Sequence, residues 1–299
     1  MGTSKISIIG SGIVGTATGR GFHKLGHDVI FYDIASEKIR PLKNLGYNVA
    51  FTLEEAMSQT GISFICVNTP TNNGQQDLSQ IMSVLYQLSN FLNNSDGFHL
   101  LVFRSTMLPG TMNNFVVNYL ERHCTKKRGI HYEVCYNPEF LRQNSALDDF
   151  FSPDRVILGE DRKGISESLI SMYKELTDKI IVTSFEAAEL IKYASNCFLS
   201  LKISFFNEIG MICRSVGVDD KIVSLGVSLD KRIGKYGTEA GRPFDGMCLP
   251  KDTQALASFM KQHDIVPDLL QVVLDINKKI EDITATRQIV SGIRESVQV

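Results

Sequence analysis

The sequence predicts an α/β fold, in which an N-terminal domain with a doubly wound, mostly parallel sheet is followed by an all-α dimerisation domain. Three observations support this prediction. In residues 1–182, short apolar segments of strand length alternate with segments long enough for a crossover helix. A glycine-rich turn separates the first of these strands from the first helix. In residues 183–299 the apolar residues instead recur mainly with helical spacing.

Composition argues against several classes of protein. The 299 residues are 43% hydrophobic and 21% charged, as in a globular chain of about two domains. A net charge of −2, without a basic block, argues against nucleic-acid binding. No run is long enough to span a membrane and no signal-peptide pattern opens the chain, so we expect a cytoplasmic protein. The six cysteines have no zinc-site or disulfide spacing, so we expect no metal.

A dinucleotide-binding turn follows the first predicted strand, residues 5–9. The motif Gly10-Ser11-Gly12-Ile13-Val14-Gly15 leads from it into a helical stretch. Its glycines allow a tight turn, the close approach of a pyrophosphate and close packing of helix on strand, as in a Rossmann domain. The second predicted strand, residues 28–32, ends at Asp33. A carboxylate there accepts hydrogen bonds from an adenosine ribose and repels a 2′-phosphate, which favours NAD over NADP.

Further strands are expected at residues 62–67, 99–103, 132–136, 155–158 and 180–182. Because ligands of such sheets bind beyond the carboxyl ends of the strands, the residues after each strand are candidates for binding. They include Asn68-Thr69-Pro70-Thr71, Arg104-Ser105-Thr106 with Pro109-Gly110-Thr111, and Asn137-Pro138-Glu139-Phe140. Helix capping is the alternative role for the serines, threonines and asparagines. Glu139 has in addition the chemistry of a general base.

The second domain is predicted to be built on one long helix, residues 186–216. On this helix Lys192 and Asn196 lie one turn apart, and Ser200 and Asn207 continue the same polar stripe. Apolar neighbours leave little room for a wide solvated face, which favours a functional lysine over an exposed one. Shorter helices are expected at residues 217–230, 252–262 and 268–289. A helical domain of this size needs a partner surface to pack against. The simplest partner is a second copy of the chain, so we expect a homodimer.

Cys248 is predicted to be a nucleophile. It lies in a loop rich in glycine and arginine, and Pro250, Lys251 and Asp252 follow it closely. A nearby cation on a flexible backbone favours the thiolate, which is the reactive form of the side chain. The alternative is a buried and inert cysteine, but a core cysteine usually lies in an apolar periodic run.

Taken together, these motifs resemble the UDP-glucose/GDP-mannose dehydrogenase family over nearly the whole chain. The matching segments are Gly10 to Gly15, Cys66-Val67-Asn68-Thr69-Pro70, Ser105-Thr106 with Pro109-Gly110-Thr111, Asn137 to Leu141, Glu189 to Asn196, Arg232-Ile233-Gly234 and Cys248 to Asp252. The resemblance implies a UDP-glucose 6-dehydrogenase-like enzyme of polysaccharide biosynthesis. It would oxidise the primary alcohol of a nucleotide sugar to a carboxylate with two NAD. Residues implied to hold NAD are Gly10, Gly12, Ile13, Val14, Gly15, Asp33, Thr69, Pro70, Thr71, Ser105 and Thr106.

The resemblance also implies a role for each catalytic residue. The Cys248 thiolate would attack the aldehyde formed by the first oxidation, and the thiohemiacetal would be oxidised to a thioester and hydrolysed. Lys192 and Asn196 would stabilise the oxyanion, and Asp252 would polarise water beside Lys192. Glu139 and Thr106 would position and activate water. Substrate contacts are implied for Glu139, Phe140, Leu141, Arg142, Lys192, Asn196, Gly246 and Arg232, the last across a dimer interface.

The chain departs from the family pattern in three places. Asp245-Gly246-Met247 precede Cys248, where two adjacent glycines and a small residue are usual. Arg142-Gln143 stand where many members have a second acid. Members also usually continue into a third domain, a second Rossmann-like fold that supplies much of the nucleotide-diphosphate pocket, whereas this sequence ends at Val299.

Two other functions remain open on sequence grounds. A lysine followed four residues later by asparagine, in a chain of about this length, also resembles the β-hydroxyacid dehydrogenases. Their two-electron oxidation needs no nucleophilic cysteine. A non-catalytic remnant that keeps NAD binding and dimerisation is the third possibility, although every catalytic position holds a chemically competent residue.

Overall fold

The chain folds into two compact units in the computed structural model, which describes residues 3–297, with side chains as far as residue 286. The first unit contains the residues up to 70 and residues 76–192. The second contains residues 71–75 and the residues from 193 onward. One helix, α8 (Phe185–Val216), continues through the division at residue 192. The sequence places the boundary between the two domains after residue 182, whereas the compact units divide at residue 192, within one helix. The domain boundary at residue 182 stays a prediction.

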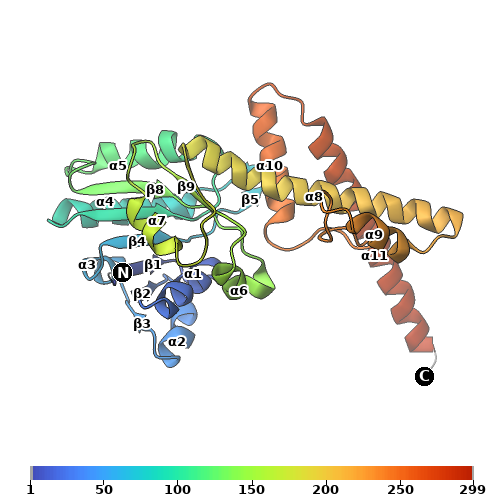
Figure 1. Cartoon of the computed structure of the whole chain (residues 1–299), viewed down its shortest axis with the longest axis horizontal. Coiled ribbons are helices and arrows are strands. Elements are labelled where there is room, and N and C mark those ends of the chain that lie inside the picture. The colour runs from blue at the N-terminus through green and yellow to red at the C-terminus, as the bar shows by residue number, and fades with distance from the viewer. Residues whose placement is uncertain (1–2, 298–299) are drawn as a thin grey trace. The chain divides into compact units, whose positions relative to one another are not determined.

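The first unit is built on an eight-stranded sheet in the order β10-β9-β8-β7-β4-β1-β2-β3 (Figure 1). Its strands are β1 (Lys5–Ile9), β2 (Asp28–Tyr32), β3 (Asn48–Val49), β4 (Ile62–Ile65), β7 (His99–Phe103), β8 (Tyr132–Tyr136), β9 (Val156–Gly159) and β10 (Ile180–Thr183). Neighbouring strands are parallel except β8 and β9, which meet in antiparallel fashion at Tyr136 and Gly159. The predicted doubly wound, mostly parallel sheet is confirmed.

Helices cover both faces of this sheet because its central strands are apolar on both sides. Leu101 and Phe103 belong to one core cluster, whereas Leu100 and Val102 belong to the other. The first cluster includes residues of α3 (Leu53–Ser58), α4 (Ser79–Asn94) and α5 (Asn118–His123). The second includes residues of α1 (Ile13–Lys24), α2 (Ser36–Asn44), α6 (Ala146–Phe151) and α7 (Glu167–Tyr173). Short helices also span Met112–Val117 and Gln143–Ser145.

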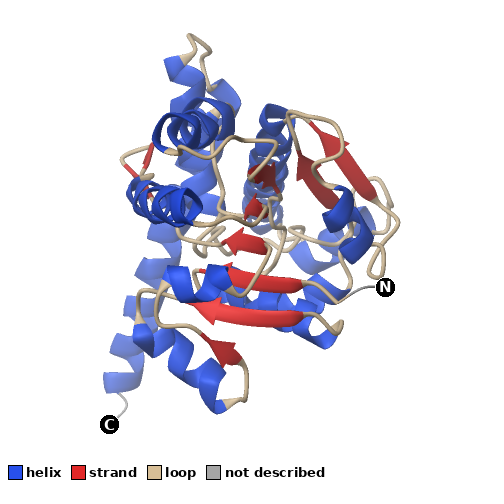
Figure 2. Ribbon diagram, turned by 90° about the vertical axis from the view of Figure 1, so that its left-hand side faces the viewer, coloured by secondary structure: helices blue, strands red, loops and turns tan. Residues whose placement is uncertain are grey.

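The second unit is helical, as the sequence predicts. Its helices are the remainder of α8, then α9 (Asp220–Ser228), α10 (Leu249–Gln262) and α11 (Asp268–Val297), shown as blue ribbons in Figure 2. Cys197, Ala257 and Leu270 join α8, α10 and α11 in a small apolar core. The unit also includes the tip of a hairpin formed by β5 (Thr71–Asn72) and β6 (Gln75–Gln76), where Gly74 packs against Ser258 of α10.

The predicted element boundaries differ from the observed ones mainly at helix ends. α10 begins at Leu249 rather than at Asp252, with Cys248 as its N-cap residue and Pro250 in its first turn, where proline is well tolerated. α11 continues to Val297, beyond the expected end near residue 289. Within residues 3–297, no helix combines the length and the apolar character that crossing a membrane requires.

Gly21 of α1 offers a direct test of this packing. A Cβ atom at Gly21 would lie 2.2 Å from ring carbons of Phe150, and that ring is itself packed edge-on against Phe22. We expect Gly21→Ala to lower the free energy of unfolding by about 1–3 kcal/mol through overpacking, as measured by urea denaturation. Gly97→Ala is the matched control, because nothing lies within 4 Å of a Cβ there. Equal stability of the two variants would contradict this account.

Candidate active site

The glycine-rich turn after β1 has the backbone that a dinucleotide site requires. Gly10 has φ +97°, and a Cβ there would lie 2.8 Å from the carbonyl oxygen of Cys66. A Cβ on Gly15 would lie 1.9 Å from the carbonyl oxygen of Gly10. Among the described residues, no side chain caps the start of α1 at Gly12. The first N–H groups of this 12-residue helix are therefore left for an anionic ligand.

Asp33 lies at the carboxyl end of β2, as predicted. Its buried carboxylate accepts hydrogen bonds from the backbone N–H groups of Ser11, at 2.7 Å, and Ala35, at 2.9 Å. The Lys38 ammonium also lies 3.5 Å from the carboxylate oxygen that binds Ser11. These contacts fix an acid next to the glycine-rich turn and leave a lone pair on its other oxygen for a ribose hydroxyl. In the second unit, the hydroxyl oxygen of Thr71 is buried and has no hydrogen-bond partner in the described part of the chain. The glycine-rich turn and Asp33, which both belong to the first unit, therefore fit NAD.

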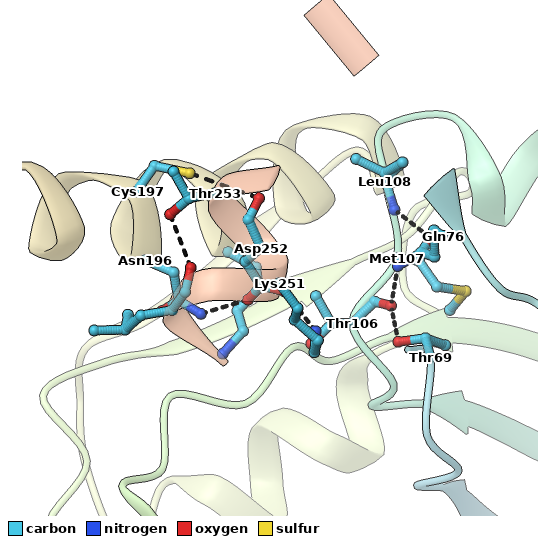
Figure 3. Close-up of polar contacts among 12 residues, drawn as sticks. Thr69, Gln76, Thr106, Met107, Leu108, Asn196, Cys197, Lys251, Asp252 and Thr253 are labelled. Carbon is cyan, nitrogen blue, oxygen red and sulfur yellow. Dashed lines mark hydrogen bonds and ion pairs between the residues drawn. The ribbon is translucent and has the colours of Figure 1, made fainter. Parts of the chain in front are cut away.

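The loop after β7 brings Thr106 to Thr69, two residues that are 37 apart in sequence. The Thr106 carbonyl oxygen accepts hydrogen bonds from the Thr69 hydroxyl, at 2.6 Å, and from the Gln76 amide, at 2.9 Å (Figure 3). The Ser105 hydroxyl donates to the carbonyl oxygen of Val67 at 2.6 Å. The predicted cofactor residues 69, 105 and 106 thus lie together at the carboxyl edge of the sheet.

Glu189 fixes the other end of this loop, and the sequence analysis did not single it out. Its carboxylate accepts hydrogen bonds from the N–H groups of Gly110, at 2.6 Å, and Met112, at 2.7 Å. Burial raises the pKa of Glu189 to about 8 despite these two bonds. The sequence feature that could have identified Glu189 is its position three residues before Lys192, on the same face of a helix.

Glu139 and Lys192 form a buried ion pair. The Lys192 ammonium donates to the Glu139 carboxylate at 2.8 Å and to its backbone carbonyl oxygen at 2.6 Å. Both side chains are at most 6% exposed. Burial would raise the pKa of Glu139, but Lys192, the N–H group of Leu141 and the charge on Arg104 together lower it below its usual value. Glu139 is therefore an ionised carboxylate held in a dry environment.

Arg104 is a second cation near this pair, and its role was also missed. Its guanidinium is buried and donates to Asn137 Oδ1 and, at 2.9 Å, to the Tyr173 hydroxyl. No carboxylate oxygen of the described side chains lies within ion-pair distance of it. Because Asn137 begins the segment that carries Glu139, Arg104 anchors that segment, and its positive charge also lowers the pKa of Glu139.

The other predicted substrate residues near Glu139 are divided between two environments. The Phe140 ring centroid lies 5.3 Å from the Lys192 ammonium and 3.9 Å from the guanidinium of Arg155, both in cation–π geometry. Leu141 contributes its N–H group to Glu139 at 2.7 Å. Arg142 instead pairs with Asp149 at 2.5 Å, with its side chain 67% exposed. Of these residues, Phe140 and Leu141 join the cluster and Arg142 does not.

In the second unit, Cys248 occupies the N-terminus of α10 and is half-buried. The N–H group of Asp252 donates to the Cys248 carbonyl oxygen at 3.0 Å, which is the first backbone bond of the helix. A helix N-terminus carries a partial positive charge that favours a thiolate over a thiol. The position therefore suits a nucleophile. No disulfide bond joins any of the six cysteines in the part of the chain that the structure describes.

Asp252 lies in the first turn of the same helix and is completely buried. Its carboxylate accepts hydrogen bonds from the Asn196 amide, at 2.6 Å, and the Lys251 ammonium, at 2.5 Å (Figure 3). Asn196 and Asp252 were both predicted as catalytic residues, and they are brought together. Lys251 is an additional member of this group that the sequence analysis recognised only as part of a motif.

Two predicted substrate residues of the second unit lie at its surface. The Arg232 side chain is 89% exposed and pairs with Asp230 at 2.6 Å. Gly246 is exposed and has φ +79°, a conformation that favours glycine. Neither is joined to the Asn196–Asp252 group by a hydrogen bond among the described contacts.

Comparison with known proteins identifies relatives along most of the chain. Residues 43–177 match the NAD-binding domain of the UDP-glucose/GDP-mannose dehydrogenase family, and residues 186–279 match the central domain of that family. Residues 5–75 also match the family of coenzyme F420-dependent NADP oxidoreductases.

The chain is 36% identical over 298 residues to a UDP-glucose 6-dehydrogenase from Rickettsia bellii, covering 92% of this chain and 67% of that protein. It is also 36% identical over 296 residues to a GDP-mannose 6-dehydrogenase from Pseudomonas syringae, covering 91% of this chain and 68% of that one. The solved structure of a UDP-glucose dehydrogenase from Pyrobaculum islandicum matches with a TM-score of 0.85 and 34% identity, over 93% of this chain and 68% of that one.

Removal of Lys192 tests the electrostatics of Glu139. In the wild type the lowered pKa means that ionised Glu139 stabilises the fold above its ordinary pKa of 4.5, and this contribution is lost as the pH falls through the folded-state pKa. In Lys192→Met, burial raises that pKa instead, so the variant becomes less stable as the pH rises above 4.5. We expect it to be about 3–5 kcal/mol less stable than the wild type at pH 7 and closer to it at pH 4.

Urea unfolding at the two pH values measures this difference. Lys179→Met, which removes an exposed lysine, is the control and should show no such dependence on pH. A deficit of the same size at pH 4 and pH 7 for Lys192→Met would contradict an ionised Glu139.

Proposed function

Because the chain belongs to the UDP-glucose/GDP-mannose dehydrogenase family and is an NAD-dependent oxidoreductase, we propose that it oxidises the primary alcohol of a nucleotide sugar to a carboxylate in two successive steps. The observation that carries this proposal is the first turn of α10, where Cys248 is the N-cap residue and buried Asp252 binds Asn196. A two-electron oxidation of an alcohol needs no thiol at such a position.

NAD, bound by the glycine-rich turn, Asp33, residues 69–71 and residues 105–106, supplies the hydride acceptor for each oxidation. Lys192 and Asn196 stabilise the negative charge that develops on the substrate oxygen as its proton leaves. A lysine ammonium is suited to this task because Lys192 is already desolvated and positioned by two hydrogen bonds to Glu139. Asp252 polarises a water molecule that takes up the proton.

The Cys248 thiolate then attacks the aldehyde carbon. A carbon–sulfur bond forms, the π electrons of the carbonyl move to its oxygen, and protonation gives a thiohemiacetal. The second oxidation converts this to a thioester. Water activated by Glu139 and positioned by Thr106 adds to the thioester carbonyl, and the carbon–sulfur bond breaks to return the thiolate and release the carboxylate.

The proposed reaction also indicates a biosynthetic role and a cellular compartment for the protein. Its product would be a sugar nucleotide with a carboxylate group, which is a building block for polysaccharide biosynthesis. A nucleophilic cysteine must remain reduced, so we place the protein in the cytoplasm, where thiols persist. Arg232, the exposed arginine of the second unit, is assigned to the substrate of a partner subunit.

We also propose a homodimer formed through the helical unit. Phe198, Phe205 and Ile212 recur at seven-residue spacing along α8, and each is more than 50% exposed. This spacing places them on one side of the helix. Exposed apolar residues of α9 (Ile222 and Leu225) and its C-cap residue Leu229 extend the apolar surface of this unit. A second copy of the chain is the occupant that would bury this stripe and give Arg232 a partner's substrate to bind.

Stoichiometry tests the proposed reaction. With NAD and a panel of UDP-, GDP- and CDP-sugars, we expect about two NADH per substrate consumed, measured by near-ultraviolet absorbance. Cys248→Ala should stop at about one NADH with aldehyde as the product, because the thioester cannot form. Lys192→Ala should lower kcat by about 10²–10³-fold, whereas Lys179→Met should retain full activity.

Other results would favour the alternative functions. One NADH per molecule of a simple hydroxyacid, with Cys248→Ala fully active, would identify a two-electron dehydrogenase. NAD binding without turnover of any substrate would favour the non-catalytic protein.

Phe205→Glu tests the proposed dimer. A buried charge opposite its symmetry mate would separate the subunits, so we expect the wild type at twice the 33.3 kDa chain mass and the variant at the monomer mass in sedimentation experiments. Leu45→Glu, which alters an exposed apolar residue of the first unit, should remain dimeric. A monomeric wild type would overturn the proposal.

A further inference from the structure

The segment that leads to Cys248 has no regular structure of its own. Residues 238–247 form neither helix nor strand, although Phe244 is buried in the middle of them. Buried backbone N–H and C=O groups need hydrogen-bond partners, and here secondary structure supplies none to this segment. Two asparagine side chains on separate helices instead supply partners for backbone groups of residues 241, 242 and 244.

Asn207 of α8 binds the first half of the segment. Its amide oxygen accepts a hydrogen bond from the N–H group of Gly241 at 2.7 Å, and its amide nitrogen donates to the carbonyl oxygen of Arg242 at 2.8 Å. The side chain is 1% exposed. It therefore pairs with the backbone as a neighbouring strand would, with one donor and one acceptor.

Asn277 of α11 binds the second half in the same manner. Its amide oxygen accepts from the N–H group of Phe244 at 2.7 Å, and its amide nitrogen donates to the carbonyl oxygen of the same residue at 3.1 Å. The nitrogen also donates to Glu281, one turn along α11, at 2.8 Å. This third bond fixes the orientation of the amide, which is 5% exposed as a residue.

We propose that Asn207 and Asn277 are positioning residues that hold the Cys248 thiol in place for the reaction proposed above. Phe244 is fixed by Asn277, and Cys248 is fixed as the N-cap residue of α10. Only residues 245–247 separate these two points. A tether of three residues leaves the thiol little freedom as long as its far end is held.

Asparagine suits this task for a chemical reason. Its amide offers a donor and an acceptor side by side without a charge, which matches the N–H and C=O groups of a peptide backbone. Aspartate keeps the acceptor but loses the donor and brings a charge into a buried place. Alanine leaves both backbone groups unpaired, and the segment then gains stability by moving into water.

The test compares Asn277→Ala and Asn207→Ala with the wild type in the full chain. Thr284→Val is the matched control, because Thr284 lies on α11 and its hydroxyl bonds only within that helix, to Ile280. We expect amide exchange in the peptide 239–248 to become at least about tenfold faster in both alanine variants, with the control unchanged. Asn207→Asp, which retains the acceptor for Gly241, should give an intermediate rate.

Two further measurements separate positioning of the thiol from general stability. Alkylation of Cys248 by iodoacetamide, followed by mass spectrometry, should become at least about threefold faster as the half-buried thiol gains access. The Kd for NAD should stay within about twofold of the wild type, because neither asparagine nor any residue of the segment 238–247 is assigned to NAD. During turnover, released aldehyde captured by hydroxylamine should increase, since a displaced thiol intercepts it less often.

The results for the two asparagines can be interpreted separately from the test of the proposed function. Unchanged alkylation in variants whose peptide 239–248 exchanges faster would overturn the positioning role, as would unchanged exchange. If either alanine variant fails to fold, the other and Asn207→Asp decide the matter. Exchange and alkylation require no turnover, so they remain decisive even if the wild type oxidises no nucleotide sugar.

Discussion

A buried ion pair, Lys192 with Glu139, is the interaction on which the rest of the candidate site depends. Two charges are tolerated away from water only when their remaining polar atoms are also bonded. Lys192 therefore binds a carbonyl as well as the carboxylate, and Glu139 also takes the N–H group of Leu141. These bonds require the segment after β8 to lie in one register against α8. Arg104, through Asn137, secures the start of that segment.

Side chains replace secondary structure in two of the functional loops. Glu189 binds two N–H groups after β7, and Asn207 and Asn277 bind the segment before α10. In each case a buried polar side chain on a long helix satisfies backbone groups that have no strand or helix partner. The rigid helices thus set the positions of loops whose own sequences, rich in glycine, specify little.

Much of the fold could be predicted from the sequence because it depends on the local pattern of apolar residues and glycines. Continuous apolar runs identified β1, β2, β7 and β8, and the glycine motif identified the turn after β1. β3 has two residues and no periodicity to detect, and the antiparallel contact of β9 depends on its tertiary partner. The roles of Arg104, Glu189 and Asn277 were missed for a similar reason. A buried arginine or asparagine looks like a surface residue until the backbone groups that it binds have been placed beside it.

The charges of the buried groups in the two units can be compared with the charges that form in the proposed reaction. In the first unit, Lys192 forms an ion pair with the ionised acid Glu139, and the positive charge of Arg104 also acts on that carboxylate. In the second unit, Lys251 balances Asp252, and the helix N-terminus adds a partial positive charge at Cys248. A buried cation costs several kcal/mol to desolvate, and an anion that develops beside it, such as the alkoxide of the proposed first oxidation, offsets that cost. The alkoxide, thiolate, tetrahedral oxyanion and carboxylate product of the proposed reaction are all anions, so buried positive charge within each unit is consistent with that proposal.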